Sequence, residues 1–274
     1  MRSIKKIITG RSAVDGAGVQ LTRVVGFHDT ADFDPFLMLD AFDSTNPDDY
    51  IRGFPFHPHR GIETITYLIE WEIEHRDSLW NSGVISSGDC QWMTAGSGII
   101  HQEMPHASPR MLGVQLWLNL PASDKMTVPT YRDIRHHTIP VVEKSASRTR
   151  IVSGSYDGMS GPTNGNHVHM TSLDVEIFPG QSWTYVTDPE ATVFVYIVAG
   201  SGDFGEGSID HKHAVLFDWG DTIQVQSWWE GIRFLLFMAQ PLHEAIAWGG
   251  PVVMNTQEKL NQAFEELENG EFIK

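Results

Sequence analysis

Two short segments carry side chains suited to binding a transition metal, His57-Pro58-His59 and His101-Gln102-Glu103. In each segment, one residue separates two metal-capable side chains. Because alternate side chains of an extended strand point to the same face, the two members of each pair would project together. Two adjacent strands carrying these pairs would direct three imidazoles and one carboxylate at one point. Such a set suits a divalent transition metal.

The residues around both pairs favour rigid, closely approaching backbone. Prolines stand on either side of His57, at Pro55 and Pro58, and reduce the entropy lost when the ligands are fixed. Gly96-Ser97-Gly98 precedes the second pair and suits a tight turn. Glu63 competes with Glu103 as the carboxylate ligand, because it follows His59 by four residues and shares its strand parity. Spacing alone does not choose between them.

Two other segments have the same histidine spacing, His167-Val168-His169 and His211-Lys212-His213. Neither has a histidine and carboxylate partner in a comparable turn, so we interpret them as ordinary strand histidines and expect no second metal site. Cys90 is the only cysteine, which excludes an intrachain disulfide, and it carries no sequence sign of an activated thiolate. The chain also lacks a serine nucleophile elbow, a phosphate-binding loop and a dinucleotide fingerprint.

The elements that must position these side chains are short β-type runs separated by turn residues. Glycine and proline clusters predict turns at Pro179-Gly180, Gly200-Ser201-Gly202 and Trp219-Gly220-Asp221. The pattern predicts an all-β protein. The expected strands are rich in β-branched and aromatic residues and span 62–69, 112–120, 168–177, 192–198, 213–217 and 233–238.

The two halves of the chain echo each other. Ser87-Gly88-Asp89 precedes one predicted strand as Trp219-Gly220-Asp221 precedes another, which favours a duplicated β-barrel over one continuous barrel. We therefore predict one domain over residues 1–140 and a second over 148–274, with a linker between them.

One amphipathic helix is expected near the end of the chain. Asn255 is a candidate N-cap with Glu258 as its capping-box partner, and Asn269-Gly270 would end the helix. The apolar residues recur at helical spacing and would pack on a barrel, at Leu260, Ala263, Phe264 and Leu267.

Composition limits the partners of the protein. The 274 residues are 41% hydrophobic, and 19 basic against 35 acidic side chains give a net charge of -16. Such a surface repels phosphates, so we expect no direct contact with nucleic acid. No run approaches the roughly 20 apolar residues of a membrane span, and the start lacks the apolar stretch of a signal peptide. We expect a cytoplasmic protein without membrane contact.

Beyond these patterns, the chain resembles the pirin family of the cupin superfamily. The resemblance is most specific in three stretches: His57-Pro58-His59-Arg60-Gly61 with Glu63-Thr64, Gln91-Trp92-Met93-Thr94-Ala95-Gly96, and Gly98-Ile99-Ile100-His101-Gln102-Glu103-Met104-Pro105. The resemblance extends over nearly the whole chain. Further similar stretches are Asp34-Pro35-Phe36-Leu37, Gln115-Leu116-Trp117-Leu118-Asn119-Leu120 and Gly250-Pro251-Val252-Val253-Met254-Asn255-Thr256.

The resemblance implies a bicupin, two antiparallel jelly-roll barrels with a C-terminal helix and one metal in the N-terminal barrel. Carried over by motif, the metal ligands are His57, His59, His101 and Glu103, which decides against Glu63. The family binds iron most often, and Mn, Co, Ni, Cu or Zn are alternatives. The C-terminal barrel of the family carries no metal, and the family favours a monomer.

The resemblance also implies an activity, that of a quercetin 2,3-dioxygenase, which opens a flavonol ring with O2 and releases carbon monoxide. Glu103 is the candidate base for the flavonol hydroxyl proton. We expect an apolar pocket near the motifs, lined by Phe54, Phe56, Trp92 and Met93. Two alternatives are a metal- or redox-dependent regulatory module that binds a partner protein, and another cupin reaction such as an isomerase.

Overall fold

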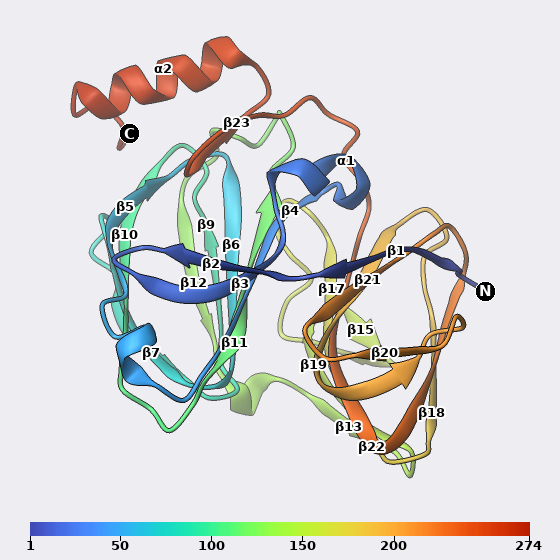
Figure 1. The fold of residues 1–274 in the computed structure, drawn as a ribbon. Coiled ribbons are helices and arrows are strands. Elements are labelled where there is room, and N and C mark those ends of the chain that lie inside the picture. Colours follow the sequence, from blue (N-terminus) through green and yellow to red (C-terminus); the bar gives the residue numbers. More distant parts are fainter. The chain divides into compact units, whose positions relative to one another are not determined.

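The computed structural model describes residues 1–274, which divide into two compact units (Figure 1). The N-terminal unit comprises residues 11–136 and 242–274, and the C-terminal unit comprises residues 1–10 and 137–241. Apart from one isolated parallel bridge between Arg60 and Val252, all strand pairs are antiparallel, as the all-β prediction requires.

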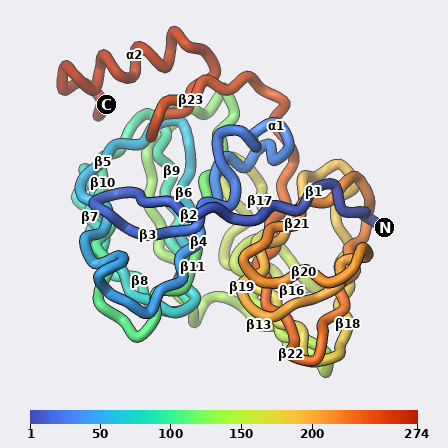
Figure 2. Tube along the Cα trace, in the orientation of Figure 1, coloured from blue at the N-terminus to red at the C-terminus, as the bar shows by residue number.

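The two compact units differ from the predicted domains, 1–140 and 148–274, at both ends of the chain. The first strand, β1 (Ile4–Thr9), pairs with β21 (His213–Phe217), and the buried Arg2 guanidinium donates to Thr187 and to three backbone carbonyls of the C-terminal unit. The last 33 residues belong to the N-terminal unit instead. Figure 2 shows the red C-terminal segment lying against blue and green strands of that unit.

The predicted linker over residues 140–147 is also a structured segment. Residues 141–143 form β13 (Val141–Glu143), which pairs with β14 (Ser147–Ser153). The predicted turn at Gly200-Ser201-Gly202 lies inside a long strand, where the register shifts. A Cβ at Gly200 would lie 2.1 Å from the carbonyl oxygen of Gly231, so glycine allows the close strand approach there.

The N-terminal unit contains two principal sheets. The seven-stranded sheet has the order β12-β9-β6-β11-β4-β3-β2, and the four-stranded sheet has the order β5-β10-β7-β8. Their strands are β2 (Arg11–Asp15), β3 (Val19–Val25), β4 (Phe36–Ser44), β5 (Phe54–His59), β6 (Ile62–Glu70), β7 (Glu72–Asp77), β8 (Ser82–Ser86), β9 (Cys90–Thr94), β10 (Ile99–Pro105), β11 (Met111–Asn119) and β12 (Thr130–Ile134). The short helix α1 (Thr30–Phe33) precedes β4.

The C-terminal unit is built on one nine-stranded sheet with an apolar core of large aliphatic and aromatic side chains. Its order is β1-β21-β19-β22-β17-β14-β13, with β18 and β20 attached at the side. The remaining strands of this unit are β15 (Ser155–Tyr156), β16 (Met159–Ser160), β17 (Met170–Ile177), β18 (Ser182–Val186), β19 (Thr192–Asp203), β20 (Ser208–Asp210) and β22 (Thr222–Ala239).

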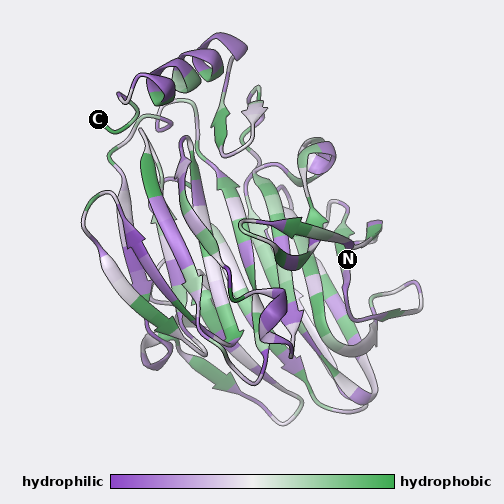
Figure 3. Cartoon of the chain, turned by 60° about the vertical axis from the view of Figure 1, so that its left-hand side comes forward, coloured by the Kyte–Doolittle hydropathy of each residue, from purple (hydrophilic) through white to green (hydrophobic).

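The final segment of the chain folds as β23 (Ala247–Gly249), β24 (Val252–Met254) and α2 (Gln257–Glu268). Thr256, rather than the predicted Asn255, is the N-cap, and its hydroxyl accepts from the Lys259 amide. Figure 3 shows α2 as a mainly hydrophilic helix with hydrophobic residues interspersed, and Leu260 and Ala263 are the buried ones. Neither α1 nor α2 has the length and apolar character that a helix needs to cross a membrane.

Candidate metal centre

The two histidine pairs lie on neighbouring antiparallel strands, β5 and β10. In this register His57 stands opposite His101, and His59 opposite Ile99. The three rings converge, with centroid separations of 4.4 Å for His57–His101, 4.8 Å for His57–His59 and 5.1 Å for His59–His101. One ring nitrogen from each histidine lies within 4.8 Å of the other two, so the arrangement can hold a metal ion.

Backbone carbonyls determine which ring nitrogen of His57 and of His59 is free to bind a metal. His57 Nδ1 lies 2.8 Å from the Pro55 carbonyl oxygen, and His59 Nδ1 lies 3.3 Å from that of Pro251. A carbonyl can only accept, so each Nδ1 carries the proton and each Nε2 keeps its lone pair for a ligand.

Burial keeps the imidazoles of His59 and His101 neutral. Burial, with a further effect of His57, lowers the pKa of His59 to about 3. Burial also lowers the pKa of His101 well below its ordinary value. Neutral imidazole is the form that binds metals.

Both ring nitrogens of His101 are buried without a hydrogen-bond partner in the protein. A buried polar group without a partner costs about 1–3 kcal/mol. An ion held by the three rings would supply the missing partner, so the donor set fits a borderline divalent metal.

Glu103 lies outside the group formed by the three histidines. Its carboxylate accepts from Gln115 Nε2 at 3.0 Å to each oxygen and from Thr66 Oγ1 at 3.4 Å. Burial raises the pKa of Glu103, although His57, Gln115 and Thr66 act in the opposite direction. Glu103 is therefore a buried carboxylate beside the histidines that is disposed to take up a proton.

The competing residues lie elsewhere. Glu63 is buried in β6 and accepts from Thr94 Oγ1 at 2.6 Å, outside the histidine group. The other histidine pairs, at 167–169 and 211–213, form no group of three metal-binding side chains. Burial raises the pKa of Cys90, which keeps its thiol protonated.

A third buried histidine, His75 on β7, stands opposite Glu103 of β10. Its ring stacks on Tyr131 at a centroid distance of 4.0 Å, and its Nδ1 lies 2.6 Å from the Tyr131 hydroxyl. Gln91 donates to the same hydroxyl. Sequence reasoning did not single out this polar network, because its members come from three separate strands.

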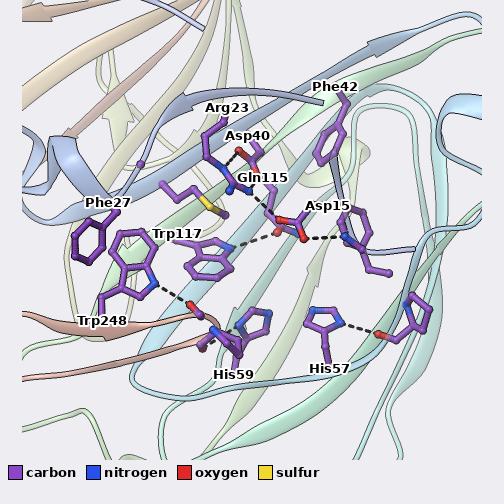
Figure 4. A pocket seen from close by; sticks show the side chains of 17 residues that line it. Asp15, Arg23, Phe27, Asp40, Phe42, His57, His59, Gln115, Trp117 and Trp248 are labelled. Carbon is purple, nitrogen blue, oxygen red and sulfur yellow. Dashed lines mark hydrogen bonds and ion pairs between the residues drawn. The ribbon is translucent and has the colours of Figure 1, made fainter. Parts of the chain in front are cut away.

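His57 and His59 line a cavity of about 610 Å³ (Figure 4). Trp117 meets the His59 ring edge to face at 5.0 Å, and Trp248 lies 6.0 Å beyond it. Phe27 packs on Trp248 at 5.6 Å, which extends the aromatic wall. A planar apolar ligand would fit against such a wall.

The charged residues of the cavity belong to β2, β3 and β4. Arg23 forms a bidentate ion pair with the buried Asp40, with hydrogen bonds of 2.9 and 2.7 Å. It also donates to Asp15 at 2.9 Å. Figure 4 shows this cluster beside Gln115, across the cavity from the labelled histidines. It adds a polar side to the aromatic pocket.

The predicted pocket lining is correct only for Phe54. Phe56 is exposed, while Trp92 and Met93 are buried and do not line the cavity. Gln115 and Trp117 alternate on β11, a pattern that could have placed them on one face. Trp248 gave no local signal, because it reaches the site through a contact distant in sequence.

Comparison with known proteins identifies the family of the chain. The Pirin family model matches residues 18–118, and the Pirin C-terminal cupin domain model matches residues 172–273. A pirin-like protein of Caulobacter vibrioides is 39% identical, with 99% of each chain covered. Human Pirin is 34% identical over 98% of this chain and 94% of its own.

Among solved structures, quercetin 2,3-dioxygenase from Acinetobacter baumannii matches with a TM-score of 0.91 and 28% identity. The alignment covers 99% of this chain and 98% of that one. The expected two-domain cupin fold, with sheets of jelly-roll type, is thereby confirmed.

Proposed function

The chain belongs to the pirin family, and we propose that it is a metal-dependent dioxygenase of the quercetin 2,3-dioxygenase type. The reaction takes up one O2, opens the central ring of a flavonol and releases one carbon monoxide. The observation that carries the proposal is a group of three histidines, two of which line an aromatic-walled cavity of about 610 Å³. The structural similarity to a quercetin 2,3-dioxygenase supports it.

We propose His57, His59 and His101 as ligands of one divalent transition metal, with Glu103 as the fourth by analogy with the family motif. Iron is the proposed native metal. A bound metal of this kind would act as a Lewis acid toward the flavonol hydroxyl and as the redox partner of O2.

Glu103 is proposed as the base that takes the proton of the flavonol 3-hydroxyl. Burial raises its pKa, which makes it a better proton acceptor than an exposed carboxylate. Gln115 holds both carboxylate oxygens and fixes their direction. Its own carbonyl oxygen accepts from Trp117 Nε1 at 3.3 Å, so the amide cannot flip without losing both contacts.

The tryptophans are proposed to bind the flat flavonol. Trp117 and Trp248 present faces and edges of aromatic rings on one side of the cavity, where a second aromatic system packs favourably. The apolar wall would also exclude water from the reacting ring. The polar cluster of Arg23, Asp40 and Asp15 offers hydrogen-bond partners to ligand hydroxyls on the other side.

The test is quercetin consumption by protein reconstituted with Fe(II) under anaerobic conditions and then exposed to air. Metal-free protein and the Glu103→Ala variant are the comparisons. We expect turnover only with metal and a rate for Glu103→Ala at least about a hundredfold lower, within the range for general acid–base catalysis. Tight metal binding without quercetin turnover by the wild type would overturn the proposal.

A further inference from the structure

We propose that the C-terminal segment, residues 242–274, orients the metal ligand His59. We further propose that the Arg60–Glu266 ion pair holds this segment in place. Arg60 and Glu266 are then positioning residues, which act on the metal through His59. This inference rests on the proposed role of the three histidines as metal ligands. It does not depend on quercetin as the substrate.

The first step of the argument is the contact between this segment and His59. The Pro251 carbonyl oxygen accepts from His59 Nδ1 at 3.3 Å and from the Arg60 amide at 3.4 Å. The Val253 amide in turn donates to the Arg60 carbonyl oxygen at 3.1 Å. Residues 251–253 thus pair with the backbone at Arg60, directly after β5. The Pro251 carbonyl also binds His59 Nδ1, the ring nitrogen that is not proposed to bind the metal.

The second step is the set of contacts between the Arg60 side chain and the C-terminal segment. The Arg60 side chain is 2% exposed, and its guanidinium donates to Glu266 Oε2 and to the Phe272 carbonyl oxygen, each at 2.7 Å. The same guanidinium lies 4.1 Å from the centre of the Phe272 ring. All three partners belong to the C-terminal segment. A buried cation next in sequence to His59 therefore keeps its partners only while this segment is in place.

Close backbone approach supports the same conclusion. At Gly61, φ is +77°, and a Cβ would lie 2.0 Å from the Val253 carbonyl oxygen. At Gly98, a Cβ would lie 2.7 Å from the Phe272 carbonyl oxygen. Both glycines adjoin the metal motifs, so both motif segments are shaped to receive the C-terminal segment.

The segment also reaches the substrate side. Trp248 lines the cavity, and its indole nitrogen donates to the Gly250 carbonyl oxygen at 2.7 Å, one residue before Pro251. One stretch of backbone therefore carries both a wall of the pocket and the carbonyl that orients His59. Hydrogen bonds to the non-ligating nitrogen of a metal-binding histidine fix its tautomer and ring direction, and their loss weakens metal binding.

The experiment measures Co(II) binding to the full-length protein by competition with a chelator, together with the visible Co(II) absorption spectrum. The variants are Glu266→Ala, the conservative Glu266→Gln and the control Glu265→Ala, which removes an exposed acid from the same helix. We expect Glu266→Ala to weaken Co(II) binding about tenfold or more and to change the spectrum. Glu266→Gln should recover part of both, because its amide oxygen can still accept from Arg60.

Binding and spectra equal to wild type in both Glu266 variants would overturn the inference, whatever their thermal stability. If Glu266→Ala does not fold, Glu266→Gln decides the question alone. Absence of Co(II) binding in the wild type would instead contradict the metal centre itself. A role of Glu266 in fold stability alone would leave the Co(II) spectrum of folded protein unchanged, which also counts against the inference.

Discussion

Gln115 Nε2 lies 3.0 Å from each carboxylate oxygen of Glu103, and its Oε1 accepts from Trp117. This glutamine therefore ties the pocket wall to the carboxylate beside the three histidines. Its amide is oriented by two neighbours at once.

Replacement of Gln115 by leucine should reduce turnover more than substrate binding. A lost hydrogen bond to a charged group is worth about 1.5–3 kcal/mol, which corresponds to about ten- to a hundredfold in kcat. Steady-state oxygen uptake with quercetin would measure kcat and KM separately. The control is Gln224→Leu, on the exposed side of β22. An unchanged kcat with a raised KM would show that Gln115 contacts substrate without assisting Glu103.

The ligand assignment predicts different results for two histidine variants. His101→Ala removes a side chain from the centre of the group and should lower metal affinity at least about a hundredfold, because even outer contacts cost ten- to a hundredfold. His167→Ala should leave the metal content unchanged, since His167 lies outside the group. Metal content of the purified, reconstituted proteins provides the measurement. Equal loss in both variants would contradict a single site.

Trp248→Ala tests the aromatic wall of the cavity. Loss of this ring removes packing area and an aromatic contact, which together are worth about 1–2 kcal/mol of binding free energy. KM for quercetin should therefore rise about tenfold. Trp229→Ala is the control, because Trp229 is 79% exposed on the C-terminal unit. An identical KM in wild type and Trp248→Ala would mean that substrate binds elsewhere.

The ion pair of Arg60 and Glu266 predicts an acid dependence of stability. Burial alone would raise the pKa of Glu266, but hydrogen bonds from Arg60, Lys274 and Gln262 outweigh it and lower the pKa to about 2. A carboxyl whose pKa is lowered in the folded state stabilises fully above its unfolded value, near 4.5, and loses this effect between that pH and about 2.

Thermal unfolding of wild type and Glu266→Gln at several pH values checks this dependence. The difference in Tm should be largest at pH 6 and should shrink as the pH is lowered from 4.5 toward 2. A difference that is constant over this range would show that ionised Glu266 adds nothing to stability.

The local parts of the structure could be predicted from the sequence. The alternation along 112–120 indicated β11, and the spacing of His57 with His59 placed both side chains on one strand. The expected metal motifs meet because β5 and β10 are neighbours. These features depend on a period of two residues, which a single sequence displays directly.

The features that could not be predicted depend on contacts distant in sequence. Nothing near Pro251 or Trp248 indicates that they complete a site built around His59, nearly 200 residues earlier. Each terminus likewise joins the unit built mainly from the other part of the chain. Arg2 donates to Thr187 of the C-terminal unit, and the C-terminal segment supplies Glu266 to Arg60 of the N-terminal unit. The N-cap is Thr256 rather than Asn255, whose side-chain amide donates to Glu244 and to the Ala245 carbonyl oxygen.

The most direct test of the proposed activity is a reaction of the Fe(II)-reconstituted protein with quercetin under ¹⁸O2, analysed by mass spectrometry with simultaneous detection of carbon monoxide. Dioxygenase chemistry predicts that both oxygen atoms enter the ring-opened product, with one carbon monoxide released for each O2 consumed. Glu103→Ala should suppress both signals together. Quercetin loss without carbon monoxide, or with no ¹⁸O in the product, would contradict the proposal.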